Sequence, residues 1–152
     1  GNSFTVLTHN GKPFKNVRSI IEDTKGNIWL GGHDGLWRYD GTTFTNFTHQ
    51  FVGYVYEDQD GNIWTSMNSE RTKGSETGLQ SISDQKGWTL ARYHEKLLAN
   101  NAMVPEIIRT NEGMIFGILE AGDGSVWFGT LNGVYRYDGE TIKDFKGKNI
   151  QE

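Results

Sequence analysis

A short motif, Gly-x-x-Trp, occurs three times in the 152 residues and limits the folds open to this chain. Its copies lie at residues 26–29, 61–64 and 124–127. Each copy follows an apolar run that ends in a glutamate, at Glu22, Glu57 and Glu120. The tryptophans are 35 and then 63 residues apart, so the middle repeat contains an insertion. Repeats of about 35 to 45 residues, each with several strands, are typical of propeller blades.

The first and third repeats follow the same plan. Residues 16–47 and 114–145 align without a gap, and 12 of the 32 aligned positions are identical. In the first repeat we expect strands at Val17–Glu22, residues 27–31, Gly35–Tyr39 and residues 43–47. In the third we expect strands near residues 115–119, 125–129, 134–137 and 141–145. Asp and Gly at the intervening turns favour tight reversals, so each repeat predicts a blade of four antiparallel strands.

The second repeat matches the others only through Trp64. We expect its strands at residues 52–56, 62–66, 79–83 and 88–92, with a polar segment at residues 67–78. Residues 93–113 then lead into the third repeat, and a helical turn is expected at residues 94–100. Near the N-terminus, residues 4–7 resemble the last strand of the first repeat, and they predict the outer strand of a preceding blade.

Together the repeats predict an all-β chain. It is expected to form a single partial β-propeller domain over residues 1–152, with four-stranded antiparallel blades at about residues 16–47, 51–92 and 114–145. The 20 glycines suit many tight turns, and the abundant aromatic residues suit half-buried strands. Propellers usually have about four to eight blades, so three blades cannot close a ring. Either the chain is the C-terminal part of a larger propeller, or copies of it associate to complete one.

The composition excludes several classes of partner and site. The net charge of -4 and the pI near 5.6 argue against nucleic acid or an anionic membrane as a partner. No stretch approaches about 18 consecutive apolar residues, so no membrane insertion is expected. The chain has no cysteine, which excludes disulfides and thiolate zinc sites. We expect no cofactor and no bound metal.

From the end of its apolar strand, the first repeat has the pattern Glu-Asp-x-x-Gly-Asn-Ile-Trp-x-Gly-x-x-x-Gly-Leu-x-Arg-Tyr-Asp-Gly-x-x-Phe. This pattern resembles the two-component regulator propeller repeat, which builds the periplasmic sensor region of bacterial hybrid histidine kinases and also occurs in secreted propeller proteins. The resemblance covers residues 16–47, 52–65 and 115–145, and it is lost over residues 67–113. It implies a β-propeller in the periplasm or outside the cell, with ligand sensing or protein interaction rather than catalysis.

The irregular segments indicate where a ligand would bind. In a propeller, the second-to-third and fourth-to-first strand connections emerge on one face, so we expect residues 67–78 and 93–113 to lie there together. Irregular loops on a regular scaffold often carry binding sites. We therefore predict a ligand face with polar contacts from His33, Asp34, Asn68, Arg71 and Asn132. The aromatic neighbours make a glycan fragment the expected ligand, with another small molecule as the alternative.

Other residue patterns favour structural roles. Trp29, Trp64 and Trp127 recur once per repeat, which favours packing between blades over carbohydrate stacking. Asp58 and Asp60 place carboxylates at alternate positions, as a calcium loop does. The other repeats do not keep that arrangement, so a turn is favoured over a metal site.

Three functions remain open. The first is a non-enzymatic ligand-binding, sensing or protein-interaction module of the bacterial cell envelope. The second is a propeller enzyme, a lyase or hydrolase acting on a glycan or small molecule, which would need His33, His94 and Glu95 to converge. The third is a structural platform whose partner is another copy of the chain.

Overall fold

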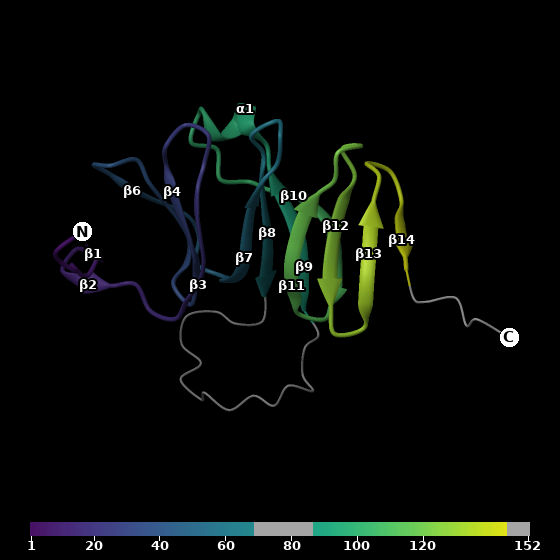
Figure 1. Ribbon diagram of the computed structural model, residues 1–152, viewed down its shortest axis with the longest axis horizontal. Coiled ribbons are helices and arrows are strands. Elements are labelled where there is room, and N and C mark those ends of the chain that lie inside the picture. The colour runs from purple at the N-terminus through teal and green to yellow at the C-terminus, as the bar shows by residue number, and fades with distance from the viewer. Residues whose placement is uncertain (69–86, 146–152) are drawn as a thin grey trace, which may run out of the picture.

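The computed structural model describes residues 1–68 and 87–145. They form three four-stranded antiparallel sheets that stand side by side in chain order (Figure 1). The sheets do not close into a ring, so they are three consecutive blades of a partial β-propeller. The all-β prediction is confirmed. Among the described residues the helical content is α1 (Glu95–Leu98), and no helix there has the length and apolar character needed to cross a membrane.

The first and third sheets follow the predicted plan. The first contains β3 (Val17–Glu22), β4 (Ile28–Gly32), β5 (Gly35–Tyr39) and β6 (Phe44–Thr48). The third contains β11 (Ile115–Glu120), β12 (Val126–Thr130), β13 (Gly133–Tyr137) and β14 (Ile142–Asp144). In both sheets the strand order is the chain order, so each consecutive pair is an antiparallel hairpin.

The second sheet differs from its prediction in its last two strands. It contains β7 (Phe51–Glu57), β8 (Ile63–Asn68), β9 (Trp88–Tyr93) and β10 (Glu106–Glu112). Because β9 pairs directly with β8, the prediction that residues 88–92 form the fourth strand is wrong. They form the third strand, and β10 is the fourth. The third strand predicted at residues 79–83 lies outside the described residues, whereas the predicted helical turn is confirmed as α1.

The N-terminal segment also differs from its prediction. Residues 4–7 form no strand, because no neighbouring blade offers them a backbone partner. A short hairpin follows instead, with β1 (Thr8–His9) pairing with β2 (Lys12–Pro13). Its turn residues, Asn10 and Gly11, have φ angles of 52° and 73°, the left-handed pair that an Asn-Gly hairpin turn requires.

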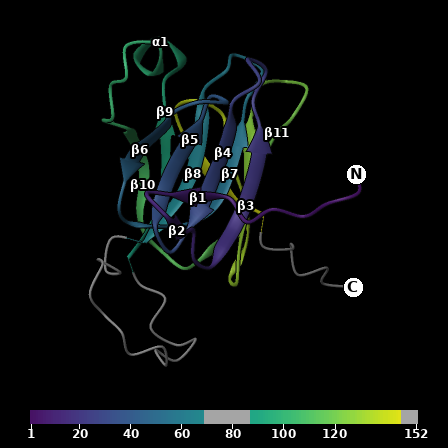
Figure 2. The same cartoon turned by 90° about the vertical axis from the view of Figure 1, so that its left-hand side faces the viewer.

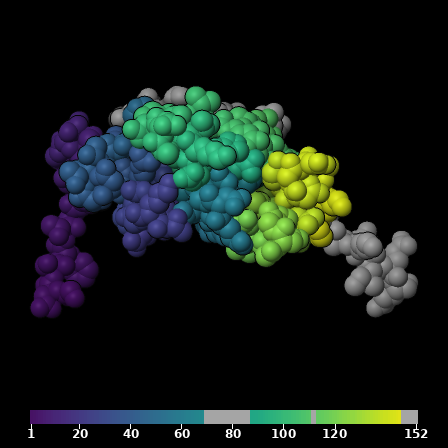
Figure 3. Space-filling view, turned by 90° about the horizontal axis from the view of Figure 1, so that it is seen from above, coloured from purple at the N-terminus to yellow at the C-terminus, as the bar shows by residue number. Residues whose placement is uncertain are grey.

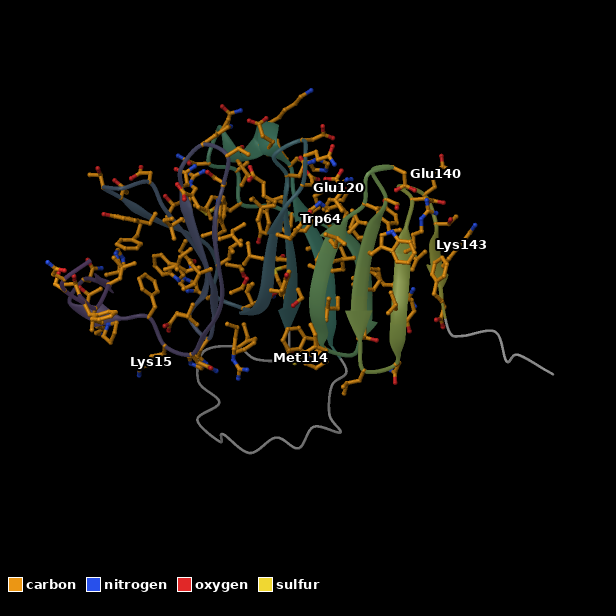
Figure 4. All side chains as sticks on the ribbon, in the orientation of Figure 1. Lys15, Trp64, Met114, Glu120, Glu140 and Lys143 are labelled. Atoms are coloured by element: carbon orange, nitrogen blue, oxygen red, sulfur yellow. The ribbon has the colours of Figure 1, made fainter. Side chains whose placement is uncertain are left out.

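The two ends of the sheets carry different connections. The upper end, as drawn in Figure 1, carries the first-to-second-strand turns at residues 23–27, 58–62 and 121–125. The lower end carries second-to-third connections, including residues 33–34 and 131–132. Figure 4 marks the upper end by Glu120 and Glu140 and the lower end by Lys15 and Met114.

With β9 as the third strand of the second sheet, one irregular segment lies at the upper end and not at the lower end. Residues 94–105 connect β9 to β10, the third and fourth strands, so they lie at the upper end with α1 (Figure 1). Asn68 ends β8 at the lower end. The prediction that residues 67–78 and 93–113 share a face is therefore wrong for Asn68 and residues 94–105, and residues 69–78 lie outside the described residues.

Two apolar clusters join the blades. The first lies between the first and second sheets, where Trp29 packs with Val52 and Val55, and the second lies between the second and third, where Trp64 packs with Ile118. Trp29 and Trp64 are each 1% exposed, which confirms their predicted packing role. The third equivalent, Trp127, is half-buried on the outer side of the last blade.

Candidate functional site

A cleft of about 230 Å³ opens at the upper end between the first and second sheets. Seen from above, the segment that contains α1 lies against the first sheet (Figure 3). Most of the side chains that line the cleft are charged or carry an amide. The lining residues are Asp23, Lys25, Asn27, Trp29, Arg38, Asp40, Glu57, Gly61, Glu95, Leu98, Ala99 and Asn101.

One wall of the cleft comes from an insertion. In the first and third sheets the third and fourth strands are joined by tight turns at Asp40-Gly41 and Asp138-Gly139. In the second sheet the equivalent connection runs over residues 94–105 and includes α1. Leu98, Ala99 and Asn101 from this connection line the cleft. An enlarged loop on an otherwise regular scaffold is a common place for binding residues.

Arg38 joins the insertion to the first sheet. Its guanidinium lies 5.7 Å from the Trp29 ring centroid and 5.2 Å from that of Phe47. Its Nη2 donates to Asn101 Oδ1 at 2.8 Å, and its Nη1 is 3.5 Å from the carbonyl oxygen of Leu98. The planar guanidinium is thereby stacked and oriented, with N–H donors fixed at the cleft.

Two carboxylates of the cleft bridge the blades. Glu57, at the end of β7, accepts hydrogen bonds from the backbone N–H of Thr24 at 2.9 Å and from its hydroxyl at 2.8 Å. Glu95, in α1, forms an ion pair with Lys25 of the first sheet's upper turn. These contacts hold the insertion and the second sheet against the first.

Two further carboxylates, Asp23 and Asp40, accept hydrogen bonds from residues of their own turns. Burial by itself would raise the pKa of Asp23, but hydrogen bonds from Trp29 and Asn27 outweigh it and hold that pKa below the ordinary value of 3.8. The backbone N–H groups of Thr43 and Thr42 lower the pKa of Asp40. Both groups are therefore ionised at neutral pH and present acceptors, not acids.

The cleft combines fixed donors from Arg38, Lys25 and amides with fixed carboxylate acceptors. This arrangement can bind a small polar molecule that both donates and accepts hydrogen bonds. Among residues 1–68 and 87–145, no group of three or more His, Cys, Asp or Glu side chains is placed to hold a metal ion. The calcium-like residues form a turn, as expected: Asp58 accepts hydrogen bonds from the backbone N–H groups of Asp60 and Asn62 and from the indole of Trp64.

The predicted ligand contacts lie at the opposite end. His33 and Asn132 are exposed on the lower connections, and Asn68 is largely buried at the end of β8. Asp34 Oδ2 accepts a hydrogen bond from the backbone N–H of Lys15 at 2.7 Å. Arg71 lies outside the described residues. None of the described four lines the cleft at the upper end.

The side chains required for the enzyme alternative are also separated. His33 lies at the lower end, whereas His94 and Glu95 lie at the upper end. His94 Nε2 is 2.6 Å from a carboxylate oxygen of Glu106, and Glu95 is paired with Lys25. The proposed catalytic convergence of these three residues is therefore wrong.

The first blade matches a known protein-family model. The family model described as "Two component regulator propeller" matches residues 11–34, which span β3 and β4. The chain carries this propeller repeat. The resemblance noted in the sequence is thereby confirmed for the first blade. Comparison with curated proteins finds no match.

Solved structures share the propeller fold. A virginiamycin B lyase from Staphylococcus aureus, crystallised as an inactive variant with quinupristin, matches with a TM-score of 0.62 and 18% identity over 95% of this chain and 45% of that one. A protein described as a gluconolactonase matches with a TM-score of 0.58 and 14% identity over 82% of this chain and 47% of that one. The chain thus spans about half the length of these two structures.

A third match is the extracellular domain of BT4673 from B. thetaiotaomicron, described as a hybrid two-component system. Its TM-score is 0.38 and its identity 16%, over 85% of this chain and 24% of that one. At identities of 14% and 18%, the similarities to the first two structures describe the fold alone.

The cleft residues of the propeller repeat were not among those predicted from sequence. Arg38 recurs as Arg136, so its pattern indicated a repeated structural role and not a site. Asn101 lies in the insertion, which the sequence did reveal by its length. These two residues lie together because β9 is the third strand of its sheet. The connection that follows it, residues 94–105, therefore lies at the upper end.

Proposed function

We propose that this propeller segment is a non-catalytic ligand-binding module of an envelope sensor, located in the periplasm or outside the cell. The observation that supports this most is the enlarged connection of residues 94–105, which walls a cleft beside Arg38. Among the described connections between strands of one sheet, it is the one that departs from the repeated tight turns. The propeller repeat in the first blade is consistent with a sensor region.

The ligand that best fits the cleft is a small hydroxyl-rich molecule such as a glycan fragment. Sugar hydroxyls both donate and accept hydrogen bonds, so they can pair with carboxylates and with the Arg38 guanidinium at once. The volume of about 230 Å³ suits a small ligand, because pockets for drug-sized ligands begin at about 300 Å³. Fixed, pre-oriented groups reduce the entropy lost when such a ligand binds.

The experiment is calorimetric titration of the full chain with maltose, cellobiose and digalacturonate. A ligand in the cleft lies beside Trp29, so binding is also expected to change tryptophan fluorescence. Asn101→Ala and Arg38→Lys should each raise the dissociation constant about tenfold or more. Arg38→Lys keeps the charge but removes the planar donor set, which separates geometry from charge.

The matched controls are His33→Ala and Asn132→Ala at the lower end, which should leave the affinity unchanged. If these two variants lose binding while Asn101→Ala keeps it, the ligand binds the lower end and the cleft assignment is wrong. If none of the three sugars binds, the assignment of a hydroxyl-rich ligand is wrong.

A further inference from the structure

The cleft at the upper end carries more negative than positive charge. Among the described residues, four carboxylates and two cations line it, which is a formal excess of two negative charges. The carboxylates are Asp23, Asp40, Glu57 and Glu95, and the cations are Lys25 and Arg38. Charge of one sign in a recessed site concentrates ions of the opposite sign there, so the lining favours a positively charged ligand.

The excess charge is located on two of the carboxylates. Asp23 accepts hydrogen bonds from the Trp29 indole at 2.8 Å and from the Asn27 amide at 2.9 Å. Glu57 accepts from the backbone N–H of Thr24 at 2.9 Å and from its hydroxyl at 2.8 Å. All of these donors are neutral. They orient the two carboxylates but leave their negative charge unbalanced.

Two glutamates come close together around Gly61, in the upper turn of the second sheet. A Cβ added to Gly61 would lie 3.1 Å from Cγ of Glu95 and 3.9 Å from Oε1 of Glu57. Glu95 belongs to α1, which lies at the upper end of the sheets (Figure 2), and it pairs with the Lys25 ammonium. One glutamate of the cleft thus already binds an ammonium group, close to a second glutamate.

The two cations of the cleft are engaged by the protein. Lys25 is paired with Glu95. Arg38 donates to Asn101 Oδ1 at 2.8 Å and lies over the Trp29 ring. An anionic ligand would compete with these partners and would also face the excess carboxylates, so the cleft disfavours acidic sugars.

We propose that the ligand of this cleft is an amino sugar whose ammonium group binds beside Glu57 and Glu95. This inference rests on the proposed function, because it specifies which kind of hydroxyl-rich molecule the cleft binds. A protonated amine supplies a positive charge and three N–H donors, which suit two carboxylates. The ring hydroxyls pair with the remaining N–H donors of Arg38.

The test compares two disaccharides of the same linkage. The β-linked dimer of glucosamine differs from cellobiose by an ammonium in place of one hydroxyl on each ring, so the pair isolates the charge. At about pH 6 the amines are protonated and the carboxylates are ionised. Calorimetric titration of the full chain should give a dissociation constant for the glucosamine dimer about tenfold lower than for cellobiose, and the difference should shrink as salt is added. Digalacturonate should bind more weakly than cellobiose.

The outcomes separate this inference from the proposed function. Equal affinity for the glucosamine dimer and cellobiose would mean that the cleft binds sugars without using their charge, and only the inference would be wrong. Tighter binding of digalacturonate than of cellobiose would also overturn it. If no sugar binds, the proposed function fails as well. Putrescine, a diamine without hydroxyls, should bind about tenfold more weakly than the glucosamine dimer, and equal affinity would overturn the assignment of a sugar.

Two variants should shift the preference for the glucosamine dimer over cellobiose in opposite directions. Glu57→Gln removes a negative charge but keeps a side-chain oxygen as the acceptor for Thr24, so the preference should fall about fivefold. Lys25→Gln removes the ammonium that competes for Glu95, so the preference should rise about threefold. The preference is a ratio of two affinities of the same variant, so a loosened cleft wall would change both affinities and leave the ratio unchanged.

The control is Glu140→Gln, which makes the same charge change at the upper end of the third sheet, outside the cleft lining (Figure 4). It should leave the preference unchanged, with circular dichroism confirming that every variant is folded. An equal fall in Glu57→Gln and Glu140→Gln would mean that the overall charge of the chain, and not the cleft, sets the preference. That result would overturn the inference.

Discussion

The indole Nε1 of Trp29 donates a hydrogen bond to the carboxylate of Asp23, 2.8 Å away. The same bond joins Trp64 to Asp58 at 2.8 Å in the second blade. Each carboxylate thus organises its turn and at the same time satisfies the polar atom of a tryptophan that is buried between blades. In the third blade Ala121 stands in place of the aspartate, and Trp127 donates instead to Ser125 Oγ at 3.1 Å.

Asp58→Ala should destabilise the fold by about 1–3 kcal/mol, because it leaves the buried indole N–H of Trp64 without an acceptor. Asp58 is itself buried and also accepts from Asn62. Urea unfolding measures the change. Asp60→Ala, an exposed carboxylate in the same turn, should cost less than about 0.5 kcal/mol. Similar losses in both variants would show that the tryptophan bond is not the cause.

Gly31→Ala should destabilise the fold by about 1–3 kcal/mol, because the new methyl group would overlap Val52 and Val55. The matched variant is Gly129→Ala in the third blade, where the added Cβ meets nothing within 4 Å. Thermal unfolding compares the two. A Gly129→Ala variant that loses as much stability as Gly31→Ala would contradict this account of the blade contact.

Protonation of Asp138 should contribute to unfolding of the protein in acid. Hydrogen bonds from the backbone N–H groups of Thr141 and Glu140 and from the Thr141 hydroxyl lower the pKa of Asp138 from 3.8 to about 2. Its stabilising contribution is therefore complete above about pH 4 and is lost as the pH falls toward 2. Asp138→Asn removes the titration, so the melting temperature should fall less steeply between about pH 5 and 2.

The control for this pH dependence is Glu140→Gln, which removes an exposed carboxylate from the same turn. Its melting temperature should follow the slope of the unmodified chain. An unchanged slope in Asp138→Asn would mean that the hydrogen bonds in this turn do not couple to protonation.

Arg38→Ala should loosen the insertion that walls the cleft. The variant loses the bond to Asn101 and the stacking on Trp29, so α1 is held less firmly. Hydrogen exchange of the amides at residues 97–102 should be about tenfold faster, equivalent to about 1.4 kcal/mol of local stability. Arg136→Ala, the equivalent change in the third blade, should leave these amides unchanged because Arg136 bonds to Asp123.

Much of the fold could be predicted from the repeats because the signals act over short distances. Apolar runs with Asp and Gly between them predicted all four strands of the first and third sheets to within two residues. Where the repeat pattern ends after Trp64, no such signal remained, and the strand at residues 88–93 was assigned to the wrong place. Asn10-Gly11 is a strong local signal for the hairpin that the structure contains, whereas the likeness of residues 4–7 to residues 44–47 predicted a strand that does not form.

The sequence prediction places the ligand contacts at the lower end, whereas the cleft lies at the upper end. The length of the insertion indicated that binding residues would lie near it, but its end of the sheet depends on which strand precedes it. Arg38 and Asn101 are 63 residues apart, and no local pattern connects them. The predicted contacts at His33, Asp34, Asn68, Arg71 and Asn132 stay a prediction, with the titration above as their test.

The sequence by itself determined the first and third blades, the packing of Trp29 and Trp64 and the glutamate that ends each inner strand, because hydrophobic alternation and turn chemistry operate within a few residues. Only the tertiary structure decided that Trp88 pairs with Asn68, which makes β9 the third strand and places α1 at the upper end of the sheets. Such pairing joins segments that are far apart in the chain, so no local pattern indicates which strands are neighbours. The cleft follows from that long-range arrangement.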